Sequence, residues 1–454
     1  MEGRKLDPKK ELPNKVDELS QEALTLHAYY RGKIQIAPRC AVRNIDDFSI
    51  WYTPGVAVPC RAIEKDKSLV YDYTLKGNTI AVVSNGTRVL GLGNIGPEAG
   101  LPVMEGKALL FKYLGGVDAV PICLDTTDPD EFIQTVKCLQ PSFGGINLED
   151  IEQPKCFYIL DRLRQEMSIP VWHDDQQGTA AVTVAGMINA AKVVGKKFSD
   201  LNIVLIGAGA ANTCVAKMLI TAGAQPENLI MVDSKGTLHK DRADIEAKKE
   251  EYKEKWKLCL TTNGCQIKGG AAEALQGADA VVALSKPGPG TIPADWIKNM
   301  AADAIVFACA NPTPEIWPWE AKQAGAKIVA TGRSDFPNQV NNSLIFPGLF
   351  RGALDVRAQA ITDDMCIAAA KALAGYAEAQ GILSEDSILP TMDELDVFAA
   401  VAAAVGTKAI EQKVARINRS YDELFAQAKT IIEQVRTLTD LMMHQQLIPQ
   451  PPGD

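Results

Sequence analysis

Short apolar strands alternate with helical segments from about residue 79 onward, and this alternation limits the possible folds more than any other feature of the sequence. In the first half of the chain, strands are expected at 79–84, 117–124, 143–148 and 169–172, with helices at 105–116, 128–139 and 154–166 between them. Two parallel strands need a long crossover, which a helix supplies. The pattern therefore predicts an α/β domain built on a parallel sheet.

Acidic residues follow the second, third and fourth of these strands. Asp125 comes after the second, Glu149 and Asp150 come after the third, and Asp174 and Asp175 come after the fourth. In open parallel sheets, ligands bind outside the carboxyl ends of the strands. The sequence thus predicts that one edge of the sheet is lined with carboxylates, although Asp125 alone is best explained as a turn or cap residue.

The two acidic pairs have both a functional and a structural explanation. Carboxylates are hard oxygen ligands that suit Mg²⁺ or Mn²⁺. Asp174 and Asp175 could instead cap the helix that follows them, and Glu149 and Asp150 could form a charged first turn before Pro154. Successive residues of an extended chain point in opposite directions, so each pair is expected to supply one inward ligand unless the loop turns. Because the pairs end neighbouring strands, we favour a metal site.

Three further side chains of this half could carry chemistry. Lys107 lies in an apolar helix, where it can act as a general base only if its pKa falls far below the usual value of about 10.4; otherwise it is a surface lysine. Tyr52 precedes a Thr-Pro-Gly turn that would fix its phenol, although packing is the ordinary role of a tyrosine. Arg88 borders a glycine-rich segment and could clamp a carboxylate, or it could be a surface arginine.

A second strand–helix–strand unit begins with "NIVLIGAGAAN" at 202–212. A strand leads into a glycine-rich turn that opens a helix, and Asp233 ends the next strand. Such glycines let the backbone approach a pyrophosphate, the helix N-terminus attracts its charge, and the acid accepts a hydrogen bond from a ribose hydroxyl. This predicts a Rossmann-like NAD(P)-binding domain. The expected cofactor contacts are Gly207, Ala208, Gly209, Ala210, Ala211, Asn212, Asp233, Ser234 and Lys235.

Two details of this motif bear on the cofactor. Asn212 occupies the third glycine position, so the helix is expected to lie slightly farther from its strand. Asp233 favours NAD because it repels a 2′-phosphate, while Ser234 and Lys235 beside it keep NADP possible. The cofactor is therefore expected to be NAD or NADP, with NAD favoured.

The complete pattern predicts an α/β chain with helical termini. We expect a catalytic domain for metal and substrate at 1–176, a Rossmann-like domain at 177–415, and a C-terminal helix and tail at 416–454. Asn311, Asn341 and Asn342 follow strands of the second domain, where they could be turn residues or substrate amides. The last helix begins with "SYDE" at 420–423, which has the capping-box pattern.

Composition excludes several classes of partner. A net charge of −9 without a basic tail argues against nucleic acid, and no apolar run is long enough for a membrane helix. The N-terminal sequence has no targeting pattern, so a cytoplasmic location is expected. The 10 cysteines form no CxxC pair and are expected to be reduced, and with only 4 histidines there is little material for a zinc site.

Seven segments together resemble the malic enzymes. In chain order they are "YTPGVA", "LGLGNIGPEAGLPVMEGKALLFK", "GGINLEDI", "HDDQQGTAAVTVAG", "GAGAAN", "ANPTPE" and "NNSLIFPG". The length resembles the shorter bacterial type. The resemblance implies a metal-dependent oxidative decarboxylation of L-malate to pyruvate and CO₂ with reduction of NAD or NADP. It also implies a homodimer or homotetramer, for which the helical N-terminus is a candidate interface.

The resemblance implies a role for each matching residue. It makes Lys107 the general base that takes the malate hydroxyl proton as hydride leaves C2, with Asp174 near the lysine, and Tyr52 the general acid that protonates C3 after CO₂ is lost. It places Mg²⁺ or Mn²⁺, the Lewis acid of this reaction, on Glu149, Asp150 and Asp175. The positions that match substrate contacts are Arg88, Asn311, and Asn341 or Asn342.

Three alternatives stay open. A malolactic-type enzyme would use the same residues but give lactate without net reduction of the cofactor. An amino-acid dehydrogenase would share the paired α/β domains without requiring the two acidic pairs. A non-catalytic nucleotide-binding regulator would keep the glycine-rich turn and Asp233 while losing the acids or Lys107, all of which this chain has.

Overall fold

The computed structural model describes residues 8–452, which form two compact units. The first unit combines the N-terminal segment up to Ala57 with the C-terminal segment from Glu433, and the second spans Val58–Ile432. Each unit is described by itself. The domain limits expected from the sequence, at residues 176 and 415, stay predictions.

The first unit is helical. It contains α1 (Pro8–Tyr30), α2 (Phe48–Trp51) and the last part of α18 (Tyr421–His444). The Tyr30 hydroxyl donates a hydrogen bond to the carbonyl of Pro449 at 2.8 Å, which joins the two segments of the unit. The capping box expected at the start of α18 is confirmed, because the Glu423 N–H donates to Ser420 Oγ at 3.3 Å and the Ser420 N–H donates to Glu423 Oε2 at 2.8 Å.

A four-stranded sheet forms the first part of the second unit. Its strands are β1 (Thr79–Ser84), β2 (Asp118–Cys123), β3 (Gly145–Leu148) and β4 (Val171–His173). They are all parallel, as predicted, and lie in the order β2-β1-β3-β4. The crossover helices are α5 (Pro97–Gly115), α6 (Pro129–Leu139) and α7 (Lys155–Glu166). Helix α5 begins earlier than expected because Pro97 occupies its first turn, where proline is favoured.

The second sheet has six strands in the order β10-β9-β8-β5-β6-β7. They are β5 (Ile203–Ile206), β6 (Leu229–Asp233), β7 (Gly236–Thr237), β8 (Ala280–Ala283), β9 (Ala304–Ala308) and β10 (Ala326–Thr331). All neighbours are parallel except β7, a short antiparallel edge strand that the sequence analysis missed. The associated helices are α9 (Ala210–Ala222), α10 (Ala243–Glu246), α11 (Lys253–Thr261), α12 (Ala271–Ala274), α13 (Ala294–Lys298) and α14 (Pro318–Gln323).

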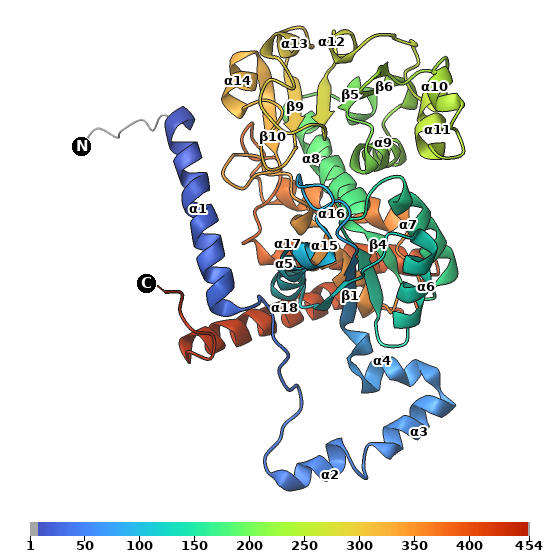
Figure 1. The fold of residues 1–454 in the computed structure, drawn as a ribbon, viewed down its shortest axis with the longest axis vertical. Coiled ribbons are helices and arrows are strands. Elements are labelled where there is room, and N and C mark those ends of the chain that lie inside the picture. Colours follow the sequence, from blue (N-terminus) through green and yellow to red (C-terminus); the bar gives the residue numbers. More distant parts are fainter. Residues whose placement is uncertain (1–7, 453–454) are drawn as a thin grey trace, which may run out of the picture. The chain divides into compact units, whose positions relative to one another are not determined.

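Further helices of the second unit lie before, between and after the two sheets in the chain. They are α3 (Ala57–Lys65), α4 (Val70–Tyr73), α8 (Thr179–Val193), α15 (Phe346–Asp355), α16 (Asp363–Ala379) and α17 (Leu395–Glu411). Helix α8 leads from the four-stranded sheet toward the six-stranded sheet and packs on α9 and α16 (Figure 1). One hydrophobic core includes Ile80 of β1, Ile203 of β5 and most of α8, so the two sheets share a core.

Except for β2, which is only partly buried, the parallel strands of both sheets are largely buried, as expected where helices cover the faces of a parallel sheet. In β1, Ile80 and Val82 join the shared core, while Ala81 and Val83 face a second core formed with α6 and α7. None of the helices within residues 8–452 is long and apolar enough to cross a membrane. All 10 cysteines lie in the described part of the chain and are free thiols, as predicted.

Candidate functional site

The carboxyl ends of β3 and β4 form the acidic edge that the sequence predicted. Glu149 and Asp150 directly follow β3, and Asp174 and Asp175 follow β4, its neighbour in the sheet. Residues Asp174–Gly178 form a single π-helical turn before α8. Such turns are rare and recur at functional sites. The chain does not continue straight after β4, so the two aspartates of this turn are not constrained to opposite faces.

Lys107 of α5 reaches this edge. Its ammonium lies 2.5 Å from Asp174 Oδ2 and 2.9 Å from Glu149 Oε1, and its side chain is only 9% exposed. The ammonium also lies 4.4 Å from the centre of the Phe346 ring, a cation–π distance. The expected proximity of Lys107 and Asp174 is confirmed, and the alternative of a surface lysine is wrong. The contact with Glu149 was not foreseen.

The contacts of Lys107 do not give it the lowered pKa that a catalytic lysine needs. Burial by itself would lower the pKa of Lys107, but the negative charges of Asp174 and Glu149 outweigh burial and hold the pKa above its usual value. The condition set in the sequence analysis for a general base, a pKa far below the usual value, is therefore not met by these protein contacts alone. Lys107 is therefore an ammonium ion here, and its positive charge partly neutralises two buried carboxylates.

Asp174 is fully buried and accepts hydrogen bonds from three side chains. Besides Lys107, Asn342 Nδ2 donates to Oδ2 at 2.5 Å, and Trp172 Nε1 donates to Oδ1 at 3.3 Å. A Cβ atom on Gly178 would lie 1.9 Å from Asp174 Oδ1, so only glycine fits there. Helix α8 has no side-chain cap at its N-terminus, so capping does not explain Asp174.

The other three carboxylates lie close together. The N–H of Asp150 donates to Asp175 Oδ2 at 2.8 Å, and Asp150 itself has a left-handed backbone with φ 54°. Asn147 donates to Glu149 Oε2 at 2.9 Å. Asp150 Oδ2 is buried and has no hydrogen-bond partner among residues 8–452. A buried carboxylate oxygen without a partner is costly and suggests an absent ligand.

Burial, together with the proximity of these acids to one another, raises the pKa values of Glu149 and Asp150. Burial raises the pKa of Asp150 to about 8, with a further contribution from the charge of Asp175. Burial also raises the pKa of Glu149 well above its usual value, although Lys107 opposes this. Within residues 8–452, no group of three or more His, Cys, Asp or Glu side chains is already arranged to hold a metal ion. The oxygen donors are therefore gathered but not preorganised.

The expected substrate residues lie at different depths. Arg88 is exposed, its side chain donates to the Leu90 carbonyl at 2.9 Å, and its N–H donates to the Asp150 carbonyl at 3.1 Å. Asn311 is exposed after β9, and a Cβ atom on Gly91 would lie 2.7 Å from its carbonyl oxygen. The glycine-rich segment near Arg88 therefore passes directly against Asn311.

The two adjacent asparagines have different contacts. Asn341 Oδ1 accepts from the Ser343 N–H at 2.9 Å and so caps the short helical turn after it. Asn342 reaches Asp174 instead. Asn342 thus holds the carboxylate that pairs with Lys107, a role that the sequence analysis did not predict.

The glycine-rich turn follows β5 as expected. Gly207 has φ 98°, which favours glycine, and Gly209 is the N-cap of α9. Asn212 is fully buried, and its amide donates to the carbonyls of Ile206 and Gly207, each at 2.9 Å. The residue in the third glycine position therefore binds the end of β5 directly.

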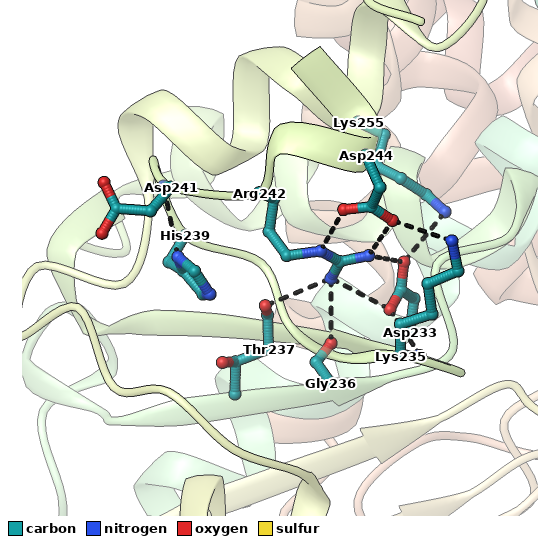
Figure 2. Close-up of polar contacts among 9 residues, drawn as sticks. All are labelled: Asp233, Lys235, Gly236, Thr237, His239, Asp241, Arg242, Asp244 and Lys255. Carbon is teal, nitrogen blue, oxygen red and sulfur yellow. Dashed lines mark hydrogen bonds and ion pairs between the residues drawn. The ribbon is translucent and has the colours of Figure 1, made fainter. Parts of the chain in front are cut away.

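Asp233 ends β6 but is not a free carboxylate. Arg242 donates to both of its oxygens, at 3.0 and 2.9 Å, and Lys255 lies 3.3 Å away (Figure 2). Burial would raise the pKa of Asp233, but the hydrogen bonds from Arg242 and the Lys235 N–H outweigh it and lower the pKa. Arg242 also binds Asp244, whose second partner is the Lys235 ammonium at 3.1 Å. The sequence argument for NAD treated Asp233 as unpaired.

A cavity of about 360 Å³ lies beside this cluster. Asp233, Ser234 and Lys235 line it on one side, and Thr291 and Trp296 line it on another. Its position after the carboxyl ends of β5 and β6 is where a doubly wound sheet binds a nucleotide.

Tyr52 belongs to the first unit and is described with that unit alone. It ends α2, its N–H donates to the Phe48 carbonyl at 2.8 Å, and its own carbonyl accepts from the Val56 N–H at 2.8 Å. These bonds fix the backbone beside the Thr-Pro-Gly turn, and the expectation that the turn also fixes the Tyr52 phenol stays a prediction. The Tyr52 side chain is 70% exposed, so it is not a core tyrosine of that unit.

Comparison with known proteins identifies relatives over almost the whole chain. The model "Malic enzyme, N-terminal domain" matches residues 31–164, and "Malic enzyme, NAD binding domain" matches residues 176–410. A bifunctional malic/malolactic enzyme of Bacillus subtilis is 48% identical over 93% of this chain and 98% of its own length. An NAD-dependent malic enzyme of Geobacillus stearothermophilus is 48% identical over 88% of this chain and 81% of its own. The crystal structure of an Entamoeba histolytica malic enzyme matches with a TM-score of 0.96 and 48% identity, covering 99% of this chain and 93% of that one.

Proposed function

The chain belongs to the malic enzyme family and catalyses the oxidative decarboxylation of malate with reduction of NAD(P), and we propose that Lys107 is the general base of this reaction. The observation that carries the proposal is the buried Lys107 ammonium, 2.5 Å from Asp174 and 2.9 Å from Glu149 at the acidic sheet edge. A lysine held this firmly has a fixed position from which to accept a proton. Arg88, Asn311 and Asn341 or Asn342 are the proposed contacts for malate.

Lys107 must lose a proton before it can accept the one on the malate hydroxyl. Asp174 Oδ2 is the nearest acceptor, at 2.5 Å, and burial raises the pKa of Asp174 and of Glu149. A carboxylate with a raised pKa can share a proton with the amine. Asn342 and Trp172 keep the Asp174 carboxylate oriented while the proton moves between Nζ and Oδ2.

The donor set fits a hard divalent cation. Asp150 has a buried oxygen without a partner, and Glu149 and Asp175 each supply further carboxylate oxygens beside it. We propose that Glu149, Asp150 and Asp175 hold Mg²⁺ or Mn²⁺. When bound, such an ion supplies Lewis-acid polarisation of the malate oxygens. Its positive charge would also reduce the negative field that now holds the pKa of Lys107 high.

Tyr52 is the proposed general acid that protonates C3 after CO₂ is lost. The support is its place in "YTPGVA", the segment that matches the family, together with its rigid turn and exposed phenol. Tyr52→Phe is expected to impair protonation of C3 more than oxidation of malate. Unchanged overall turnover of this variant would reject the assignment.

The cofactor site supports use of both NAD and NADP. Asp233 would repel a 2′-phosphate, but two hydrogen bonds from Arg242 and the nearby Lys255 offset its charge. Lys235 also lines the adjoining cavity with a side chain that is 69% exposed. We therefore propose that NAD is favoured less strongly than an unpaired Asp233 would require.

We also propose that the protein is a homodimer or homotetramer. The first unit leaves many apolar side chains exposed, including Ile36 at 99%, Leu24 at 69% and Ile45 at 78%. Contiguous exposed apolar surface marks protein–protein interfaces. A second copy of this chain is the proposed partner of this surface, and sedimentation of the purified protein would test the assembly.

The reaction is tested by incubating purified protein with malate, Mn²⁺ and either NAD or NADP. The proposed activity gives pyruvate, CO₂ and a stoichiometric amount of reduced cofactor. Lactate without net cofactor reduction would instead indicate malolactic activity, a second candidate because a 48% identical relative is a bifunctional malic/malolactic enzyme. Absence of both products would reject the proposed chemistry.

A further inference from the structure

Glu315 is a fully buried carboxylate that the proposed mechanism does not use. It follows β9 at the end of "ANPTPE", the segment that also contains Asn311. Its exposed fraction is 0%, and it forms no ion pair with any residue of the described chain. A charge buried without a counterion is costly unless neutral donors compensate it fully. The positions of the hydrogen-bond donors therefore show which parts of the chain Glu315 holds together.

The donors come from two loops at the carboxyl edge of the six-stranded sheet. Oε1 accepts from the N–H of Ser285 at 2.8 Å and from its hydroxyl at 3.1 Å, directly after β8. Oε2 accepts from the N–H of Ala310 at 3.0 Å, directly after β9. One carboxylate thus bridges the ends of two neighbouring strands. Each carboxylate oxygen accepts hydrogen bonds from a different loop.

The Ser285 loop belongs to the cofactor side of the site. The backbone carbonyl of Glu315 accepts from the Ile292 N–H at 3.1 Å, so Glu315 holds both ends of the 285–292 segment. Thr291 in this segment lines the 360 Å³ cavity beside Asp233. A Cβ atom on Gly207 would lie 2.6 Å from the Leu284 carbonyl oxygen and 3.2 Å from Ser285 Cβ. The glycine-rich turn therefore rests directly on the start of this loop.

The Ala310 end belongs to the substrate side. Ala310 immediately precedes Asn311, so the bond from its N–H to Glu315 fixes the backbone from which the Asn311 side chain projects. We infer that Glu315 is a positioning residue. It fixes the position of the 285–292 segment, beside the cofactor cavity, relative to the position of Asn311. The expected effect on malate binding rests on the proposed contact between Asn311 and malate. The expected effect on cofactor binding rests on the position of the 285–292 segment beside the cavity.

The charge of Glu315 matters because all its partners are donors. A carboxylate accepts at both oxygens, whereas the amide of Glu315→Gln has one oxygen and one NH₂ group. In that variant, an NH₂ group must face either the Ser285 donors or the Ala310 N–H. One loop is then released although the size of the side chain is unchanged. Ser285→Ala removes only the hydroxyl donor and tests the cofactor half separately.

The test compares the wild-type protein with Glu315→Gln and Ser285→Ala. NADH affinity is measured by fluorescence titration without malate or metal, and the KM for malate is measured at saturating cofactor. Glu315→Gln is expected to weaken NADH binding or raise the malate KM by at least fivefold, with a smaller loss of kcat. Ser285→Ala is expected to weaken NADH binding two- to threefold and leave the malate KM unchanged.

Asn263→Gly is the matched control. Asn263 is also fully buried, and its side chain makes three hydrogen bonds to loop backbone, but it lies at the opposite edge of the same sheet, beside the start of β6. Its φ of 54° suits glycine, so this variant loses only hydrogen bonds. It is expected to unfold at a lower temperature while NADH affinity and malate KM stay within twofold of wild type.

Two results would overturn the inference. One is a folded Glu315→Gln protein with wild-type NADH affinity and malate KM. The other is an Asn263→Gly protein with the same losses as Glu315→Gln, which would reduce Glu315 to general stability. A wild-type protein that binds NADH but does not oxidise malate would reject the proposed function instead, and the NADH titration of Glu315→Gln would still decide the role of Glu315.

Discussion

The carboxyl edges of the two sheets use buried carboxylates in opposite ways. At the four-stranded sheet, Asp174 and Glu149 bind a lysine ammonium, and Asp150 keeps an oxygen without a partner. At the six-stranded sheet, Glu315 is bound entirely by neutral donors from Ser285 and Ala310. The side chains at the first edge can exchange protons, whereas the carboxylate at the second edge fixes the backbone of two loops.

This difference separates chemistry from binding. A base must exchange protons, so Lys107 and its carboxylates need neighbours that shift their pKa values. A dinucleotide site needs fixed backbone geometry, which hydrogen bonds from neutral donors to the buried Glu315 carboxylate provide. Variants at the first edge should therefore change kcat or metal affinity, whereas variants at the second should change cofactor affinity.

Removing Asp174 is expected to have the largest effect on stability. Asp174→Ala removes the closer of the two carboxylates that contact the buried Lys107 in the described part of the chain, and it removes the partner of Asn342 and Trp172. Breaking one member of a buried ion pair costs about 3–5 kcal/mol. Urea denaturation measures the loss, with Asp174→Asn as the control that keeps the shape. A loss under about 1 kcal/mol would show that the pair is not stabilised as described.

The next prediction compares the Mn²⁺ and NADH affinities of a variant at one of the proposed metal ligands. Asp175→Ala is expected to weaken Mn²⁺ binding by at least about tenfold, which corresponds to roughly 1.4 kcal/mol, because one carboxylate of the proposed site is lost. Isothermal titration with Mn²⁺ measures this directly. NADH affinity should stay unchanged, since Asp175 lies at the other edge. Equal Mn²⁺ affinity in both proteins would place the metal elsewhere.

At the cofactor edge, Arg242→Gln frees the Asp233 carboxylate. The freed charge should repel a 2′-phosphate, so the ratio of kcat/KM for NADP to that for NAD is expected to fall about tenfold, or roughly 1.4 kcal/mol. Lys268→Gln is the control, because Lys268 pairs with Asp241 on the exposed surface and not with Asp233. A ratio that does not change would show that Asp233 does not face the ribose.

A smaller effect on stability than that of Asp174 is expected at Asp363, which lies far along the chain from Glu149, Asp150, Asp174 and Asp175. Burial would raise the pKa of Asp363, but Lys217 at 2.6 Å and Arg164 at 3.3 Å lower it overall. The folded pKa lies below the unfolded value of about 3.9, so the stabilisation is complete above that value and is lost as the pH falls through the folded pKa.

Asp363→Asn is therefore expected to lower stability by about 1–2 kcal/mol at pH 7 and to have no effect at low pH. Melting temperatures at pH 7 and near pH 2 measure the difference. Asp295→Asn breaks only an exposed pair with Lys298 and should change neither value. A pH-independent difference for Asp363→Asn would contradict the assigned ionisation.

Local sequence patterns predicted the parallel sheets because strand position, crossover helices and terminal acids all lie within short segments. The edge strand β7, only Gly236–Thr237, is too short to leave a pattern. The pairing of Lys107 with Asp174 was predicted, but the contact of Asn342 with Asp174 was not. Asn342 lies 168 positions from Asp174, and no periodicity connects them.

Charge pairing was the other feature that the sequence did not reveal. Asp233 was read as unpaired because nothing in the sequence indicates that Arg242 turns back onto it. For Lys107, the sequence indicates a possible carboxylate neighbour in Asp174 but not the contact with Glu149, whose charge also raises the pKa of the lysine. In both cases, residues far apart in the sequence supply the charges that decide the ionisation.

The most direct test of the central claim measures kcat and NADH affinity on the same preparation of Lys107→Met. A lysine that acts as general base contributes about 10²–10⁴-fold to the rate. The expected result is therefore a kcat for malate oxidation at least 100-fold lower, with NADH affinity within twofold of wild type. A kcat within tenfold of wild type in a protein that still binds NADH would contradict the account.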